Sequence, residues 1–213
     1  MTEIDSLPIL FAESNIDNFV GSQKLKDIAK KWADNYESAG SVLITGDVGR
    51  GKTHLAVAMT KLIPITKLIE PITKLVQDES NGMLKYVKAY EYQPKAKFQD
   101  ITMLVMEILK NYNEKSGTKS ALETMEPLMD GSYDVIIADD IGTCTMTEHT
   151  RQIMFVLINY WYTHEVPVLF TTNIPGEKLK DLDARIASRI MGMSKLKINL
   201  TGPDRRIISN DNI

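Results

Sequence analysis

Residues 41–53 read Ser-Val-Leu-Ile-Thr-Gly-Asp-Val-Gly-Arg-Gly-Lys-Thr and join a short apolar run to a glycine-rich segment. The run 41–45 predicts a buried strand, and residues 52–63 predict a helix that ends at Pro64. Glycines between a strand and a helix let backbone N–H groups turn inward around phosphate oxygens. The spacing Gly-x4-Gly-Lys-Thr is a complete P-loop, so the sequence predicts a nucleotide-binding α/β domain.

The P-loop assigns the first candidate site residues. Lys52 is expected to reach the β- and γ-phosphates of ATP, and the Thr53 hydroxyl is expected to bind Mg²⁺. His54 follows directly and is counted with the loop, although the three histidines are scattered and are otherwise expected to be structural or at the surface. The predicted nucleotide-binding set is Gly46, Asp47, Val48, Gly49, Arg50, Gly51, Lys52, Thr53 and His54.

Polar residues end two further apolar runs. Residues 135–138 are continuously apolar, as in a central parallel strand, and are followed by Asp139 and Asp140. A carboxylate at this place is the second nucleotide signature, so Asp139 is expected to hold Mg²⁺ and Asp140 to orient or activate the attacking water. Asn173 follows the strand predicted over 167–171 and is expected beside the γ-phosphate if the two strands are neighbours.

The rest of the chain alternates between strand and helix patterns. Apolar spacing predicts helices from Ser22 to Gly40, over the stripe from Phe98 to Tyr112, and over 150–163. Alternation of this kind predicts a parallel sheet with helices on both faces. A near repeat, 64–69 and 71–76, is interpreted as a local duplication that extends a connector. The predicted strands are 41–45, 84–92, 135–138, 167–171 and 196–200.

Composition restricts the class of protein. The 213 residues carry 25 Lys+Arg against 28 Asp+Glu, a net charge of −3, so any DNA contact requires a local basic patch. The single cysteine, Cys144, excludes a disulfide framework and a cysteine-based zinc site. We find neither a membrane-spanning apolar run nor a signal peptide, and we expect a cytoplasmic protein without membrane contact.

Basic residues give signals that are ambiguous by themselves. Arg185 and Arg189 lie four apart on one predicted helix face, where they could stabilise a transferred phosphoryl group or form a solvated basic face. Arg205 and Arg206 carry the same ambiguity. Lysines and tyrosines alternate over 85–97, which suits single-stranded DNA or an ordinary strand with solvated lysines.

Taken together, the motifs resemble the AAA+ helicase loaders of the DnaC/DnaI/IstB type. The resemblance is carried by residues 134–142, 146–148, 158–160, 171–173 and 185–189, and residues 11–19 are similar to the segment that precedes the ATPase core in that family. It implies an α/β P-loop NTPase fold of the AAA+ (ASCE) class, a three-layer sandwich with a parallel five-stranded sheet in the order 5-1-4-3-2. It also implies that Asn173 is sensor 1, Arg189 the arginine finger with Arg185 as its companion, and Arg206 the sensor 2 arginine.

The resemblance further implies ATP hydrolysis, an ATP-dependent oligomer, contact with single-stranded DNA and a replicative DNA helicase as client. We expect an N-terminal extension over 1–20, an AAA+ core over 21–207 and a tail over 208–213, with little or no C-terminal lid. Full-length loaders carry a helicase-binding domain ahead of the core, whereas about forty residues precede the P-loop here. A compact phage or prophage loader would fit this length.

Several rival functions stay open. A transposition helper ATPase shares the same core and would pair with a transposase. A small P-loop kinase is disfavoured by Asp139-Asp140, by the Thr-Thr-Asn strand end and by the arginine pair. A nucleotide switch that does not hydrolyse ATP is distinguished only by measured turnover. Asp47 and Arg50 depart from the family pattern, which more often has uncharged residues there.

Overall fold

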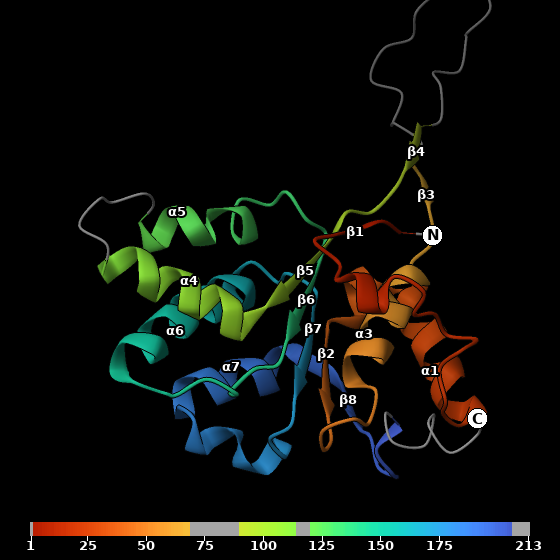
Figure 1. Ribbon diagram of the computed structural model, residues 1–213. Coiled ribbons are helices and arrows are strands. Elements are labelled where there is room, and N and C mark those ends of the chain that lie inside the picture. Colours follow the sequence, from red (N-terminus) through yellow and green to blue (C-terminus); the bar gives the residue numbers. More distant parts are fainter. Residues whose placement is uncertain (1, 69–89, 114–119, 206–213) are drawn as a thin grey trace, which may run out of the picture.

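A six-stranded parallel sheet forms the centre of the molecule (Figure 1). The computed structural model describes residues 2–68, 90–113 and 120–205. The strand order is β1-β5-β6-β7-β2-β8. The strands are β1 (Ile4–Asp5), β2 (Ser41–Thr45), β5 (Ala96–Asp100), β6 (Val135–Asp139), β7 (Val168–Thr172) and β8 (Ser194–Asn199).

Helices cover both faces of the sheet and complete a three-layer sandwich (Figure 1). One face packs against α1 (Gln23–Ala33) and α3 (Lys52–Lys61), and the other against α4 (Ile101–Asn113), α6 (Glu148–Thr163) and α7 (Ala184–Met193). Because strand side chains alternate, the buried strand β6 serves both layers: Val135 and Ile137 join the core under α3, whereas Ile136 joins the core under α6. The short elements are α2 (Tyr36–Ala39), α5 (Ala121–Met125), η1 (Ile9–Phe11), η2 (Glu126–Leu128) and η3 (Gly176–Asp181).

The predicted fold class is confirmed, and the sheet differs from the prediction at one edge. Counted without β1, the order β8-β2-β7-β6-β5 is the predicted 5-1-4-3-2. β1 adds a sixth strand beside β5, within the stretch expected to be an N-terminal extension. Its Asp5 accepts hydrogen bonds from Tyr133 and from Lys97, 2.5 Å and 2.9 Å away, which lower the pKa of Asp5 to about 2. The predicted domain boundaries stay a prediction.

The predicted position of the second core strand is wrong. It is Ala96–Asp100 rather than 84–92, and Phe98 belongs to it rather than to the following helix. Buried Ala96 and Phe98 alternate with less buried neighbours, and the helix begins directly after Asp100, whose carboxylate accepts the N–H of Met103 at 2.9 Å. A strand and a helix that join without a loop merge two apolar periodicities, which explains the error.

Residues 90–92 form a strand of a different kind. β4 (Tyr90–Tyr92) pairs antiparallel with β3 (Thr66–Leu68) in a separate two-stranded sheet that projects from the body (Figure 1). Residues 84–89 of the predicted strand lie outside the described residues. So does the near repeat, except for its beginning at 64–68.

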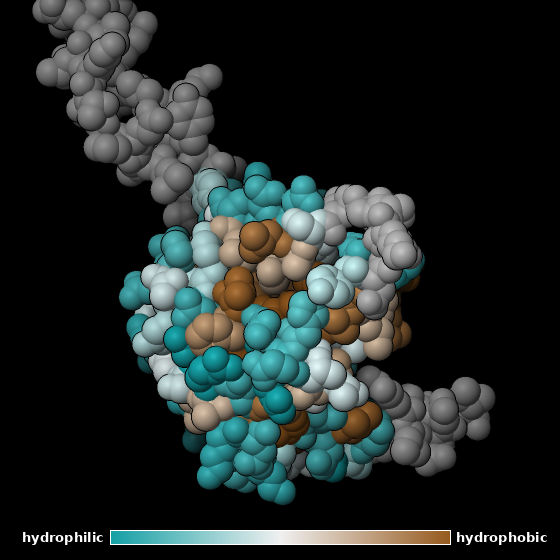
Figure 2. Space-filling view, turned by 90° about the vertical axis from the view of Figure 1, so that its left-hand side faces the viewer, coloured by the Kyte–Doolittle hydropathy of each residue, from teal (hydrophilic) through white to brown (hydrophobic). Residues whose placement is uncertain are grey.

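The face formed by α4, α5 and α6 exposes apolar side chains (Figure 2). On α4 and α5 they are Met103, Met106, Tyr112 and Leu122. Within the described ranges, no helix is both long and apolar enough to cross a membrane.

Candidate functional site

The carboxyl ends of three neighbouring strands bring several of the predicted site residues together. β2 leads into the P-loop, β6 into Asp140 and β7 into Asn173, and parallel neighbours end at the same edge of the sheet. A cavity of about 480 Å³ opens there. It is lined by Leu10, Phe11, Ser14, Val48, Gly49, Gly51, Lys52, Thr53, His54, Asp140, Thr143, Asn173 and Arg205. We call this cavity the P-loop pocket.

Backbone geometry explains the glycines that precede the N-terminus of α3. Gly49 and Gly51 have φ of +75° and +84°, a region that residues with a Cβ rarely adopt. A Cβ at Gly51 would lie 2.8 Å from Nη1 of Arg205, so the loop keeps open a space that a side chain would fill. Lys52 is only 7% exposed, and its Nζ donates to the carbonyl of Asp47 at 3.0 Å. A cradle of backbone N–H groups with a buried ammonium suits phosphate oxygens.

Thr53, which lines the P-loop pocket, and Asp139, which is buried and not among the lining residues, form a pair of hard oxygen donors. The Thr53 Oγ1 lies 2.9 Å and 3.2 Å from the two carboxylate oxygens of Asp139. Burial raises the pKa of Asp139 to about 6, against the hydrogen bonds that Thr171 and Thr53 donate to it. Mg²⁺ prefers oxygen ligands and usually takes one or two carboxylates together with water and phosphate oxygens, so this donor set fits it. In the part of the chain that is described, three or more His, Cys, Asp or Glu nowhere gather as a metal cluster.

Asp140 is held in an unusual backbone conformation. Its φ is +57°, in the left-handed region that aspartate tolerates better than most residues. Its N–H donates to Thr171 Oγ1 at 3.0 Å, and its carbonyl accepts from Thr143 Oγ1 at 2.9 Å. Asp140 and the exposed Asn173 both line the pocket that contains Lys52. A carboxylate and an amide therefore stand beside the position where phosphates would lie.

Three predicted loop residues lie apart from this pocket. Gly46, Asp47 and Arg50 line a neighbouring cavity of about 800 Å³, whose walls include neither Lys52, Thr53 nor Asp140. The larger cavity is therefore not the one with the phosphate-binding groups. Arg50 Nη2 contacts the Asp47 carboxylate at 3.0 Å, so the two charges that depart from the family pattern pair with each other.

His54 lines the P-loop pocket, but its ring nitrogen is turned toward the N-terminal segment. Nε2 lies 3.1 Å from the carbonyl oxygen of Asn15 and 2.9 Å from Oδ1 of Asn18. The ring meets Phe19 edge-on at 5.5 Å, and burial lowers the pKa of His54. His54 thus fastens residues 15–19 to α3, and its predicted contact with nucleotide stays a prediction.

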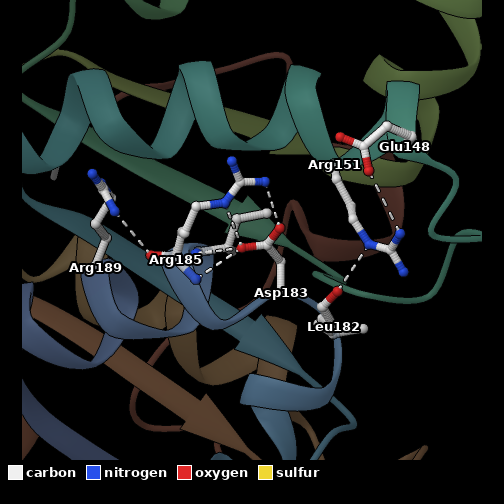
Figure 3. A network of polar contacts seen from close by, with 7 residues as sticks. Glu148, Arg151, Leu182, Asp183, Arg185 and Arg189 are labelled. Carbon is white, nitrogen blue, oxygen red and sulfur yellow. Dashed lines mark hydrogen bonds and ion pairs between the residues drawn. The ribbon is translucent and has the colours of Figure 1, made fainter.

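Arg185 and Arg189 do not reach the P-loop pocket of their own chain. Both lie on α7, beside α6 (Figure 3). Arg185 contacts the two carboxylate oxygens of Asp183 at 3.2 Å and 2.9 Å. Arg189 Nε donates to Oδ1 of Asn159 at 2.7 Å, and its guanidinium lies 4.5 Å from the ring centre of Phe155. The helix face that carries both arginines is ordered by contacts within the chain.

The arginine that the structure places at the pocket is Arg205. Arg206, the predicted sensor 2 residue, lies outside the described residues. The N–H of Arg205 donates to the carbonyl of Gly49 at 2.9 Å, and its guanidinium lies 4.6 Å from the ring centre of Phe19. The adjacent Arg-Arg pair was the available signal, but the sequence did not indicate which of the two faces the loop.

Comparison with known proteins identifies the family. The family model of the bacterial DnaA ATPase domain matches residues 12–195. The chain belongs to this family. The chromosomal replication initiator protein DnaA of Acholeplasma laidlawii is 25% identical over 181 residues, which cover 84% of this chain and 34% of that protein. For DnaA of Spiroplasma apis the identity is 27% over 158 residues, covering 74% and 49%. The chain thus spans a third to a half of the length of these relatives.

Solved structures share the fold of this DnaA-family domain. The DnaC helicase loader has a TM-score of 0.62 at 18% identity, over 91% of this chain and 100% of that one. AMPPCP-bound DnaA from Aquifex aeolicus has a TM-score of 0.63 at 18% identity, over 96% and 56%. The resemblance to AAA+ helicase-loader ATPases is confirmed at the level of fold, and the chain is an AAA+ ATPase domain of the DnaA family.

Proposed function

We propose that this AAA+ domain binds Mg-ATP in the P-loop pocket and hydrolyses it. The observation that carries the proposal is the contact between Thr53 and Asp139, which joins the P-loop to the strand end that bears Asp140. Lys52 neutralises phosphate charge, while Thr53 and Asp139 hold the metal ion. When bound there, Mg²⁺ would supply positive charge that neutralises the negative charge developing on the phosphate groups.

The remaining steps belong to side chains of this chain. The Asp140 carboxylate accepts a hydrogen bond from the attacking water and orients it toward the terminal phosphorus, and the Asn173 amide donates to the terminal phosphate or to the same water. Arg205, whose N–H donates to the carbonyl of Gly49, supplies a cation at the P-loop pocket. Leu10 and Val48, 80% and 58% exposed, are apolar side chains at the pocket that an adenine base would cover.

We further propose that the arginine finger acts between copies of the chain. Arg189 is not among the residues that line the P-loop pocket of its own chain, and a guanidinium stabilises charge on a transferred phosphoryl group only when it reaches that group. An ATP-dependent oligomer would bring Arg189 of one copy to the pocket of the next. The fixed geometry of Arg189 against Asn159 and Phe155 supports this arrangement, because little side-chain freedom remains to be lost on assembly.

The biological role that we propose is to load or remodel a replicative helicase on single-stranded DNA. One structure of similar fold is a DnaC helicase loader, and another is a DnaA bound to AMPPCP and single-stranded DNA. Of the basic-aromatic stretch 85–97, residues 85–89 lie outside the described residues, and the described part gives this role little support. Lys97 is paired with Asp5, and the Tyr92 hydroxyl donates to Asp134 at 2.6 Å.

The test combines ATP turnover with helicase loading. Asp140→Asn is expected to bind ATP and to hydrolyse it slowly, whereas Asp34→Asn, an exposed acid after α1, keeps the parent rate. The host replicative helicase is then assayed for unwinding of a circular single-stranded template with an annealed strand. Stimulation that requires this protein and ATP supports loading. Normal turnover by Asp140→Asn would refute the ATPase mechanism, and hydrolysis without stimulation would refute the loader role.

A further inference from the structure

We infer that the hydroxyl of Thr171 is the positioning group that fixes Asp139 and Asp140 relative to each other. The inference rests on the proposed function, because it assigns these acids to the metal ion and the attacking water. Thr171 lies near the end of β7, directly beside the end of β6, and would not itself touch ATP. It is 0% exposed.

Thr171 uses one oxygen to contact both acidic residues. Its Oγ1 donates to Oδ1 of Asp139 at 2.6 Å and accepts the N–H of Asp140 at 3.0 Å. A threonine hydroxyl has one proton to donate and lone pairs to accept with, so both bonds form together. The Thr171 carbonyl also accepts the N–H of Ile141 at 2.9 Å. The turn after β6 is therefore attached to Thr171 at three successive residues.

These hydrogen bonds lie just beyond the point where the regular pairing of β6 with β7 ends. Ladder pairing between β6 and β7 runs through Ala138 and Phe170 and then stops. Beyond that pair the chain turns into the left-handed conformation of Asp140, with φ of +57°. An unsatisfied buried N–H would favour another backbone conformation at that residue. The Thr171 hydroxyl therefore sets the direction in which the Asp140 carboxylate leaves the backbone, while it orients the carboxylate of Asp139.

The adjacent Thr172 provides a matched control. It is also 0% exposed and makes two hydrogen bonds through its hydroxyl. The Thr172 hydroxyl donates to the carbonyl of Ile141 at 2.7 Å and accepts the N–H of Ile174 at 3.1 Å. Neither bond involves Asp139 or Asp140. Replacing either threonine by valine removes one hydroxyl at nearly constant volume. Only Thr171→Val removes the hydroxyl that is hydrogen-bonded to Asp139 and Asp140.

The first measurement needs no nucleotide. Hydrogen exchange of the parent, Thr171→Val, Thr171→Ser and Thr172→Val is followed by mass spectrometry on short peptides. Thr171→Val is expected to speed exchange in the peptide that contains Asp140, and Thr172→Val in the peptide that contains Ile174. Thr171→Ser keeps the hydroxyl and should resemble the parent. Unchanged exchange at Asp140 in Thr171→Val would overturn the inference even if the protein hydrolysed no ATP.

The second measurement separates positioning from stability. ATP affinity is measured by calorimetry with Mg²⁺ and with EDTA, and kcat and KM are measured with Mg²⁺. Thr171→Val should lower kcat and the Mg²⁺-dependent gain in affinity by about 10-fold or more, the usual effect of losing a hydrogen bond to a charged group, with affinity in EDTA unchanged. Thr171→Ser should restore both, and Thr172→Val should leave both near the parent values.

Equal losses of kcat and of the Mg²⁺ effect in the two valine variants would mean a merely structural role and would overturn the inference. Failure of serine to rescue would do the same. Failure of the proposed function looks different: the parent itself would then bind or hydrolyse no ATP, and the hydrogen-exchange result alone would decide whether Thr171 positions the turn.

Discussion

Asp139 should make the nucleotide-free protein less stable as the pH rises through the acid range. Its side chain is buried, and burial raises its pKa to about 6, compared with 3.8 for an ordinary aspartate. The difference is about two pKa units, or about 3 kcal/mol at ~1.4 kcal/mol per unit. Between these two pKa values the folded protein binds a proton that the unfolded chain has lost. Stability must therefore fall as pH rises from about 4 to 6, and the full cost is present at pH 7.

The perturbation is Asp139→Asn, which removes the titrating group. Other residues titrate in the same range, but the effects of those that do not interact electrostatically with Asp139 cancel in the difference between variant and parent. Urea unfolding is measured at intervals from pH 4 to pH 7, without nucleotide or divalent metal. The free energy of unfolding of the variant, minus that of the parent, should rise by about 2.4 kcal/mol across this range, since a small part of the cost is already present at pH 4. A changed hydrogen bond to Thr53 or Thr171 adds only an offset that does not depend on pH.

A comparison with metal ion and nucleotide present makes the result decisive. With saturating Mg²⁺ and ATP the slope of the Asp139→Asn difference should shrink, because a nearby divalent cation favours the ionised carboxylate. A flat difference for Asp139→Asn without metal would show that the carboxyl group is well solvated in the folded protein, and the reasoning from burial would fail.

Other predictions address binding and assembly. Lys52→Ala should abolish ATP binding measured by calorimetry while circular dichroism stays that of the parent; unchanged affinity would exclude the P-loop pocket. Arg205→Ala should weaken ATP binding about 10-fold or more, as expected when a charged donor is lost; unchanged affinity would exclude Arg205 from the nucleotide site. Arg189→Ala should bind ATP normally and hydrolyse it poorly, and Arg189→Lys should not rescue it, since an ammonium lacks the planar fork. Mixing Arg189→Ala with Asp140→Asn should restore part of the activity, and a mixture that co-assembles but stays inactive would contradict a finger that acts between copies.

The fold was predictable where local sequence determines local geometry. The P-loop joins a strand to a helix within a few residues, and the buried runs of β6 and β7 are long enough to be recognised. β1 has two residues and no periodicity, so its place beside β5 is decided by tertiary contacts such as the pair of Asp5 with Lys97. β5 was misplaced because Asp100 both ends the strand and caps the next helix.

In the candidate site, too, the residues set by local sequence could be predicted, and those set by tertiary contacts could not. Lys52 and Asp139 could be named because a motif or a strand end fixes their environment. Arg205 contacts Gly49, far away in sequence, and no pattern around Arg205 distinguishes it from the next arginine. Thr171 could be placed on a buried strand, but its contact with both acids depends on the register of β6 with β7.

The two halves of the proposed ATPase site are joined by one short stretch of chain. Asn173 lies in the P-loop pocket, and the chain then passes through η3 into α7, which carries Arg189. The end of η3 is fastened where Arg151 Nε donates to the carbonyl of Leu182 at 3.2 Å, and Asp183 caps α7 through the N–H groups of its first turn (Figure 3). Asn173 and α7 are thus joined by a short stretch of chain whose end is hydrogen-bonded to α6. In the oligomer that we propose, this stretch would link the pocket of one copy to the arginine that the same copy offers to its neighbour.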